Sequence, residues 1–191
     1  MNIDDRAPQE APINPGGIES SPPELLREPL EFLFAEHFRH RQMCRILEYL
    51  AVAATFEGAL IAATDDFIRY DLALHVIDEE EDLFPLLRRR SEPGDELEKV
   101  LGVLSAEHRA DVDKAAAVCG RLEDALERRR APSHDPDARK ALTEFAAQER
   151  KVINDMSTDV ITIMNLVGFL IGLAVMALTV YTATLARRAE Y

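Results

Sequence analysis

The sequence predicts an all-α protein: an up-down antiparallel four-helix bundle, with a disordered N-terminal arm before it and a transmembrane helix after it. Three observations lead to this prediction. Apolar residues recur at helical spacing through most of the 191 residues, and no convincing two-residue alternation typical of a strand is present. The composition, 47% hydrophobic and 30% charged, is that of a folded protein. Only near the C-terminus does a long stretch without charge appear.

Residues 1–24 are rich in proline, glycine, serine and acidic residues. Such a composition buries too little apolar surface to offset the entropy lost on ordering, so we expect a flexible arm. The arm has no apolar run behind a basic start, and we therefore expect no signal peptide.

The bundle is predicted over residues 25–156, which contain four amphipathic stretches. The connections between them are short, among them SEPGD at residues 91–95, and short connections imply antiparallel neighbours. Gly58 is expected to end the first helix, and the apolar stripe of the second is expected to continue to Leu83 and Leu86. The predicted helices cover residues 29–56, 61–90 and 96–130 and a fourth segment that begins near Pro136.

Residues 157–191 are predicted to form a transmembrane helix and a short basic tail. Residues 160–186 are 27 residues without a charge, and about 20 apolar residues suffice to cross a bilayer. Gly168 and Gly172 have the small-xxx-small spacing that favours helix–helix association in lipid. The alternative is a buried core helix of a larger soluble protein.

Two basic pairs bear on the orientation in the membrane. Arg187 and Arg188 favour a cytoplasmic C-terminus, whereas Arg150 and Lys151 favour a cytoplasmic bundle. We expect the second arrangement, a single-pass membrane-anchored protein whose bundle lies in the cytoplasm.

Charge and cysteine usage exclude some classes of protein. The net charge of −13 argues against a nucleic-acid partner, because nucleic acids attract basic surfaces. Cys44 and Cys119 are isolated, and we expect both to be reduced and structural, as in a cytosolic domain.

Polar residues interrupt the apolar stripes of three predicted helices. His37, His75, Glu79 and His108 lie in phase with the apolar residues, each near the middle of its helix. A lone inward histidine is more often hydrogen-bonded than bound to metal. Four in-phase residues on three helices instead predict a metal site, because imidazole and carboxylate are ligands of iron, zinc and manganese and bundle cores hold such sites.

The other two histidines are placed outside this set. His40 drifts to the side of the stripe and is interpreted as a residue behind the ligands or at the surface. His134 falls in the connection at residues 131–137 and is expected to be solvated.

Residues 25–151 resemble the hemerythrin-type HHE cation-binding domain. The resemblance rests on an EH in the first helix, HxxxEExxLFP in the second and EH in the third, in the stretches LREPLEFLFAEHFRHRQMC, DLALHVIDEEEDLFPLLRRR and VLSAEHRADVDKAA. It implies a four-helix bundle with two carboxylate-bridged non-haem irons that binds oxygen or serves to sense or store iron, oxygen or nitric oxide. It also implies that His37, His75, Glu79 and His108 occupy ligand positions.

The fourth helix departs from the family pattern. The family has another HxxxE there, which the phase of the helix predicts at positions 152 and 156, yet this chain has Val152 and Met156. Glu149 is expected to substitute only if the helix rotates. We therefore expect one ion or a weakened site rather than a complete di-iron centre.

A second resemblance lies within residues 155–191. The segment MNLVGFLIGLAVMALTVYTATLARRAEY is similar to a membrane-spanning segment of FtsX-like permeases of ABC transporters. It implies a fusion with its seam near Lys151. Transport is not implied, since one helix forms no pathway and no GxxxxGK[ST] motif is present.

These observations favour a metal-binding module without catalytic residues, in which iron is the cofactor and oxygen or nitric oxide a further partner. One alternative is a structural or interaction bundle whose histidines are core residues and whose membrane helix pairs through the two glycines. Another is a fragment of a permease fusion without activity of its own. An enzyme is the least supported class, because no nucleophile context or second acid–base pair is present.

Overall fold

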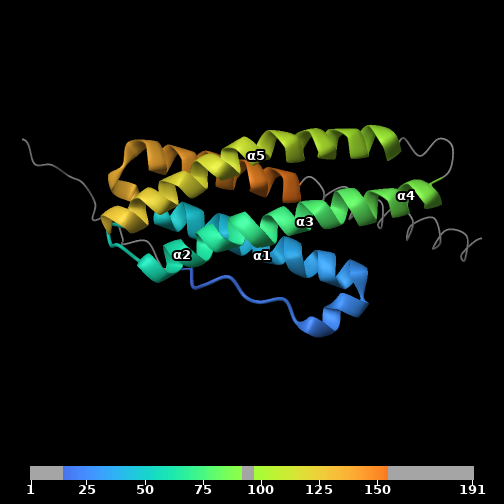
Figure 1. Ribbon diagram of the computed structural model, residues 1–191, viewed down its shortest axis with the longest axis horizontal. Coiled ribbons are helices and arrows are strands. Elements are labelled where there is room, and N and C mark those ends of the chain that lie inside the picture. Colours follow the sequence, from blue (N-terminus) through green and yellow to red (C-terminus); the bar gives the residue numbers. More distant parts are fainter. Residues whose placement is uncertain (1–14, 92–96, 155–191) are drawn as a thin grey trace, which may run out of the picture. The chain divides into compact units, whose positions relative to one another are not determined.

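The structure is a computed structural model that describes residues 15–91 and 97–154. The chain divides into two units at residue 150. In the first unit, the described residues form helices and no strand. Successive long helical segments alternate in direction and lie side by side (Figure 1). The predicted all-α bundle is confirmed.

The long helical segments follow one another with short connections. The second segment is a continuous run of helix in which two π-helical turns join three α-helical pieces. A further helix covers residues 136–154. The elements are η1 (Pro23–Arg27), α1 (Pro29–Leu50), α2 (Gly58–Asp66), η2 (Phe67–Leu72), α3 (Ala73–Ile77), η3 (Asp78–Leu83), α4 (Phe84–Arg90), α5 (Leu97–Arg128) and η4 (Pro132–His134).

The connection between α1 and α2 is longer than the sequence predicts. α1 ends at Leu50 rather than near residue 56, and Gly58 begins α2 instead of ending α1. The amide groups of Val52 and Ala53 both donate to the carbonyl of Tyr49, at 3.0 and 2.8 Å, and this tightened turn closes the helix.

Gly58 also allows a close approach. The ring of Phe56 packs against its Cα, and a Cβ at this position would lie 2.9 Å from the ring. A larger residue would therefore push Phe56 away from the start of α2.

The connection after α5 is fixed by backbone hydrogen bonds at both ends. Arg129 has a φ of 50°, its amide donates to Leu126, and the amide of Arg130 donates to Ala125. This is the Schellman pattern that stops a helix. Asp135 then caps the next helix by accepting the amide of Asp137 at 2.9 Å. The predicted helix start near Pro136 is confirmed.

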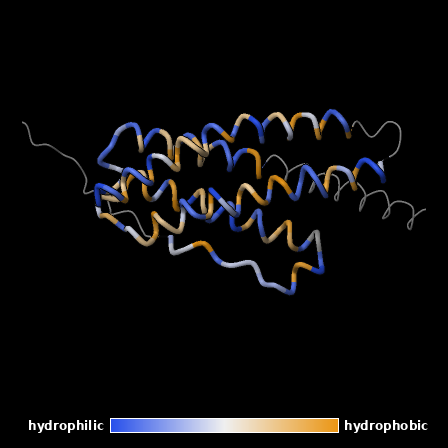
Figure 2. The backbone as a smooth tube through the Cα atoms, in the orientation of Figure 1, coloured by the Kyte–Doolittle hydropathy of each residue, from blue (hydrophilic) through white to orange (hydrophobic). Residues whose placement is uncertain are grey.

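An apolar core fills the end of the bundle near these connections. Each helix shows alternating hydrophobic and hydrophilic residues along its length (Figure 2), and the apolar side chains pack together. Cys44 and Cys119 are buried in this core as free thiols, as predicted. Its largest fully buried members include Met43, Ile46, Leu47, Leu50, Ile61, Leu122, Leu142 and Phe145.

The π-helical turn η3 shifts the buried face of the second segment. After Glu79 the next fully buried side chain is Phe84, five residues on, whereas the sequence predicts Leu83 at the regular four-residue step. A π-helix makes i to i+5 hydrogen bonds and adds one residue to the turn. The sequence predicted that the buried stripe of this segment continues through Leu83 and Leu86. This prediction is wrong, because both residues are only partly buried.

The N-terminal segment is attached to α1 where it is described. The amide of Glu19 donates to Gln42 at 2.9 Å, and Ser21 Oγ donates to Glu36 at 2.5 Å. Arg39 Nε donates to the carbonyl of Glu19 at 2.8 Å. Residues 15–24 are thus held on the bundle, in contrast to the flexible arm predicted there.

Within residues 15–91 and 97–154, no helix is long and apolar enough to cross a membrane. The predicted transmembrane segment at residues 157–191, with Gly168 and Gly172, lies outside the described residues.

Candidate metal centre

The four predicted ligands meet around one carboxylate. His37 comes from α1, His75 from α3, Glu79 from η3 and His108 from α5. Glu79 Oε1 lies 3.6 Å from His37 Nε2 and 3.3 Å from His75 Nε2, and Oε2 lies 3.2 Å from His108 Nε2. Three imidazoles on three helical segments therefore converge on a single acid, which is 2% exposed.

One oxygen of this carboxylate has no hydrogen-bond partner in the described residues. Glu79 Oε1 is fully buried and unpaired, although two imidazole nitrogens lie close to it. A buried polar atom left unpaired is costly and calls for a partner. His37, His75 and Glu79 each offer a ligand atom within 4.8 Å of the others, so a metal ion fits between them.

Electrostatics keep the central carboxylate in the charged state that a cation needs. Burial by itself would raise the pKa of Glu79, but the contacts with His108, His37 and His75 outweigh it and hold the pKa far below its usual range. Glu79 is therefore an anion at neutral pH, inside a ring of imidazoles.

A second layer orients His108. Its Nδ1 lies 2.9 Å from Glu80 Oε1, and Ser105 Oγ donates to the other Glu80 oxygen at 2.8 Å. The ring also stacks on Phe84, with centroids 6.1 Å apart. Burial lowers the pKa of His108, yet Glu79 and Glu80 raise it overall. Such outer partners fix the ring orientation of metal-binding histidines.

Of the two placements predicted for His40, behind the ligands or at the surface, the structure shows the first. It is 2% exposed, and its ring centroid lies 4.4 Å from that of His75 and 6.3 Å from that of His37. The reason is helical spacing: His40 is three residues after His37 and shares the inward face with it. Glu36, one residue before His37, is also buried.

The fourth helix contributes a buried carboxylate that the sequence did not assign to the site. Glu149 is 8% exposed, and burial together with the charge of Asp111 raises its pKa to about 7, against the opposing effects of His108 and Lys114. Glu149 thus lies buried on the α5 side without any rotation of the helix. Its phase with Phe145, four residues earlier, already indicates a buried position in the sequence.

No imidazole accompanies Glu149 in this part of the helix. Phe145 is a fully buried core residue, Val152 is apolar, and Met156 lies outside the described residues. An HxxxE motif that ends at Glu149 would need a histidine at position 145, where the chain has Phe145. The fourth-helix motif is therefore incomplete at this position, as it is at Val152 and Met156.

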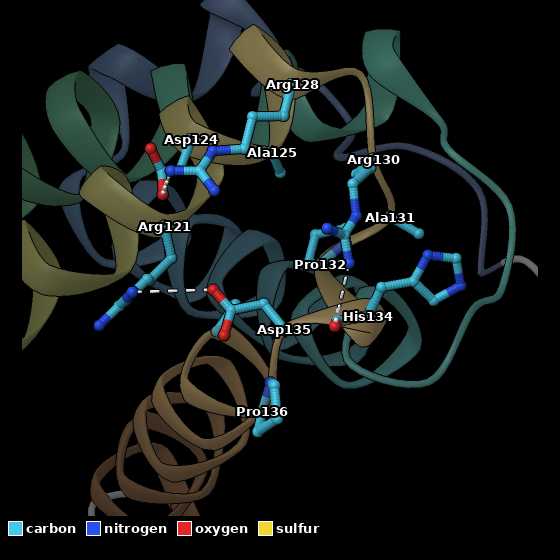
Figure 3. A pocket seen from close by; sticks show the side chains of 11 residues that line it. Arg121, Asp124, Ala125, Arg128, Arg130, Ala131, Pro132, His134, Asp135 and Pro136 are labelled. Carbon is cyan, nitrogen blue, oxygen red and sulfur yellow. Dashed lines mark hydrogen bonds and ion pairs between the residues drawn. The ribbon is translucent and has the colours of Figure 1, made fainter.

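His134 is exposed, as predicted, and lines a cavity of about 280 Å³ (Figure 3). Two of its arginines form ion pairs across the lining: Arg121 with Asp135 at 3.7 Å, and Arg128 with Asp124 at 3.4 Å. Arg121 follows His108 by 13 residues of α5, roughly 20 Å along the helix. The cavity is therefore separate from the histidine cluster.

Comparison with known proteins supports the same reading. The chain matches the family model "Hemerythrin HHE cation binding domain" over residues 28–154. No curated protein and no solved structure matches the chain. The family match spans well over half of the chain and includes all the residues of the histidine cluster, so the protein belongs to the hemerythrin HHE cation-binding domain family.

Proposed function

We propose that the protein is an iron-binding module in which His37, His75, Glu79 and His108 hold one metal ion; these four residues are called the Glu79 site below. The observation that carries this proposal is the buried, unpaired Oε1 of Glu79 between two imidazoles. A mixed set of imidazole and carboxylate suits iron, zinc or manganese, and the family match favours iron.

The chemistry of the residues supports binding rather than turnover. Iron held here would supply a redox-active centre with affinity for oxygen or nitric oxide, which we propose as further partners. The chain's own residues orient the ligands and exclude water: Ser105 and Glu80 fix His108, and Phe84 covers it. We propose no catalytic residue.

A complete di-iron centre is less well supported than a single ion. Glu149 supplies a second buried carboxylate near Asp111 and His108, but Phe145 stands where an accompanying histidine would be needed. The proposed centre is therefore one ion, with the buried carboxyl group of Glu149 on the side of His108.

The test is metal analysis of the full-length protein purified from iron-supplemented cells. We expect roughly one iron per chain in the unaltered protein, as one ligand set of this kind implies. His75→Leu/Glu79→Gln, which removes the central anion and the imidazole beside it, should lose most of the metal. The matched control His134→Gln changes an exposed histidine and should keep it. Metal at background level in the unaltered protein would leave a structural bundle as the function.

We also propose that the bundle is tethered to a membrane through residues 160–186, on the basis of their 27 uncharged residues. A fusion with an FtsX-like permease segment, a cytoplasmic bundle and pairing through Gly168 and Gly172 belong to this proposal. Fractionation of cells that express the full chain tests it: resistance to carbonate extraction, and protection of the bundle from protease outside spheroplasts, are expected. Release by carbonate would contradict the tether.

A further inference from the structure

His40 is a buried nitrogen base without a partner. Its Nε2 is fully enclosed and has no hydrogen-bond partner in the described residues, and the side chain is among the most buried polar groups of the bundle. A neutral imidazole has one N–H donor and one lone pair. The enclosed Nε2 therefore calls for a partner that the described residues do not supply, and a cation is one such partner.

Two neighbours complete a ligand set with this ring. Glu36, His40 and His75 each offer a ligand atom, and these atoms all lie within 4.8 Å of one another. All three side chains are buried. Glu36 and His40 are four residues apart on α1 and therefore share one face of the helix, while His75 faces them from α3, with its ring centroid 4.4 Å from that of His40.

The carboxylate of this set is already oriented. Arg39 Nη1 donates to both oxygens of Glu36 at 3.0 Å, and Ser21 Oγ donates to Oε1. Arg39 is in turn held by Asp71 at 2.5 Å. A carboxylate has about four lone-pair positions, so these three bonds leave one for a cation and fix the direction in which it points.

We propose that Glu36, His40 and His75 form a second position for a divalent transition-metal ion, here called the His40 site, which shares His75 with the Glu79 site. Two imidazoles and one carboxylate are a donor set for zinc, cobalt or iron(II). The His40 site uses none of Glu79, His108 and His37. Because the neutral ring of His75 has one lone pair, His75 serves one ion at a time, and the His40 site is therefore tested in a protein whose Glu79 site is disabled.

The experiment uses the full-length protein stripped of metal with a chelator and titrated with Co²⁺, whose visible absorption and equilibrium dialysis give the number of bound ions. The double variant Glu79→Gln/His108→Gln disables the Glu79 site and leaves the His40 site intact. It is expected to retain one equivalent of Co²⁺. Adding His40→Leu should weaken this binding by at least about tenfold, since one of three ligands is lost.

Two controls separate loss of a ligand from loss of fold. His134→Leu added to the same double variant replaces an exposed histidine and should leave Co²⁺ binding unchanged. Without metal, His40→Leu should keep the helical circular dichroism signal and the melting temperature, because it removes an unpaired buried nitrogen. If His40→Leu lowers the melting temperature, His40→Gln replaces it as a polar variant and must give the same loss of binding.

The outcomes distinguish this inference from the proposed function. Co²⁺ binding by the unaltered protein but not by the double variant would overturn the His40 site and leave the Glu79 site standing. Binding by the double variant that is insensitive to His40 would overturn it as well. Absence of binding in both proteins would overturn the proposed function and the second position together.

Discussion

The same helices build two different interiors at two levels of the bundle. On α1 the buried stripe begins with His37 and His40 and continues, a turn later, with Met43 and Leu47. At the apolar level the core side chains pack against one another, and among the described residues Asp65 Oδ1, beside Cys119, is a single unpaired oxygen. At the polar level Glu79 Oε1 and His40 Nε2 remain unpaired among the described residues. The difference teaches that the fold is stabilised by one level, while the other is arranged for a ligand that the chain does not supply.

The largest expected change in stability comes from a substitution in the apolar level. Leu122→Ala removes a fully buried side chain from α5, and such truncations cost about 2–5 kcal/mol because they lose buried area and leave a cavity. The measurement is the free energy of unfolding in urea. Leu74→Ala, at an exposed position of α3, serves as the control, and an equal loss in both variants would contradict the assignment of the core.

The next effect tests whether the polar level depends on a cation. Metal added at about 100 times its dissociation constant should raise the free energy of unfolding by about 2.7 kcal/mol, since only the folded state holds the ligands together. His75→Leu/Glu79→Leu should show no such gain. Without metal this double variant should be as stable as the unaltered protein or more so, because a buried polar pair gives way to apolar packing. A metal-dependent gain that survives in the variant would place the ion elsewhere.

A smaller effect concerns Glu149. Its pKa is about 7 in the folded state and about 4.3 in an unfolded chain. The folded state therefore binds the Glu149 proton more tightly than the unfolded chain does. The protonated carboxyl group contributes to the free energy of unfolding in full below about pH 4, and this contribution is lost as the pH rises to about 7. Glu149→Gln should remove this loss. The free energy of unfolding of the metal-free variant, minus that of the unaltered protein, should therefore be about 1–3 kcal/mol larger at pH 8 than at pH 4.

The check is the free energy of unfolding of both proteins across this pH range. Glu144→Gln, an exposed position one turn earlier on the same helix, should leave the pH profile unchanged. If Glu149→Gln and the unaltered protein have parallel profiles, Glu149 is not the titrating group.

The smallest effect concerns the support of His108. Ser105→Ala deletes the hydroxyl that donates to Glu80, at a cost of about 0.5–1.5 kcal/mol in stability. Metal affinity should fall by about tenfold, the low end of what outer-layer partners contribute. Calorimetric metal titration measures the second quantity. A Ser105→Thr variant, which keeps a hydroxyl, should retain most of the affinity.

The sequence predicted much of this organisation because helical periodicity is a local property. It placed the helix starts at Pro29 and near Pro136 and aligned His37, His75 and Glu79, since each stripe can be read within one helix. The fold, the convergence of three helices on Glu79 and the family follow from those alignments and from the short connections.

The remaining features depend on facts that periodicity does not contain. Phe84 replaces Leu83 on the buried face because a π-helical turn adds a residue, and nothing in the spacing announces such a turn. His40 and Glu149 point inward because the buried face is wider than a narrow stripe: Glu36 and His37 are adjacent and both buried. When a helix has neighbours on several sides, residues beyond the central apolar stripe are also buried and can serve as ligands.

The docking of residues 15–24 has a practical consequence for protein production. A shortened protein that starts at residue 25 would lose two donors to the bundle, the Glu19 amide to Gln42 and Ser21 Oγ to Glu36. It would also lose the Glu19 oxygens that accept from Arg39 and from the Gln42 amide. Expression boundaries chosen from helix limits alone would thus remove Ser21, whose hydroxyl donates to Glu36. A fragment intended for spectroscopy or crystallisation should begin no later than Ile18, which packs against the core next to Glu19.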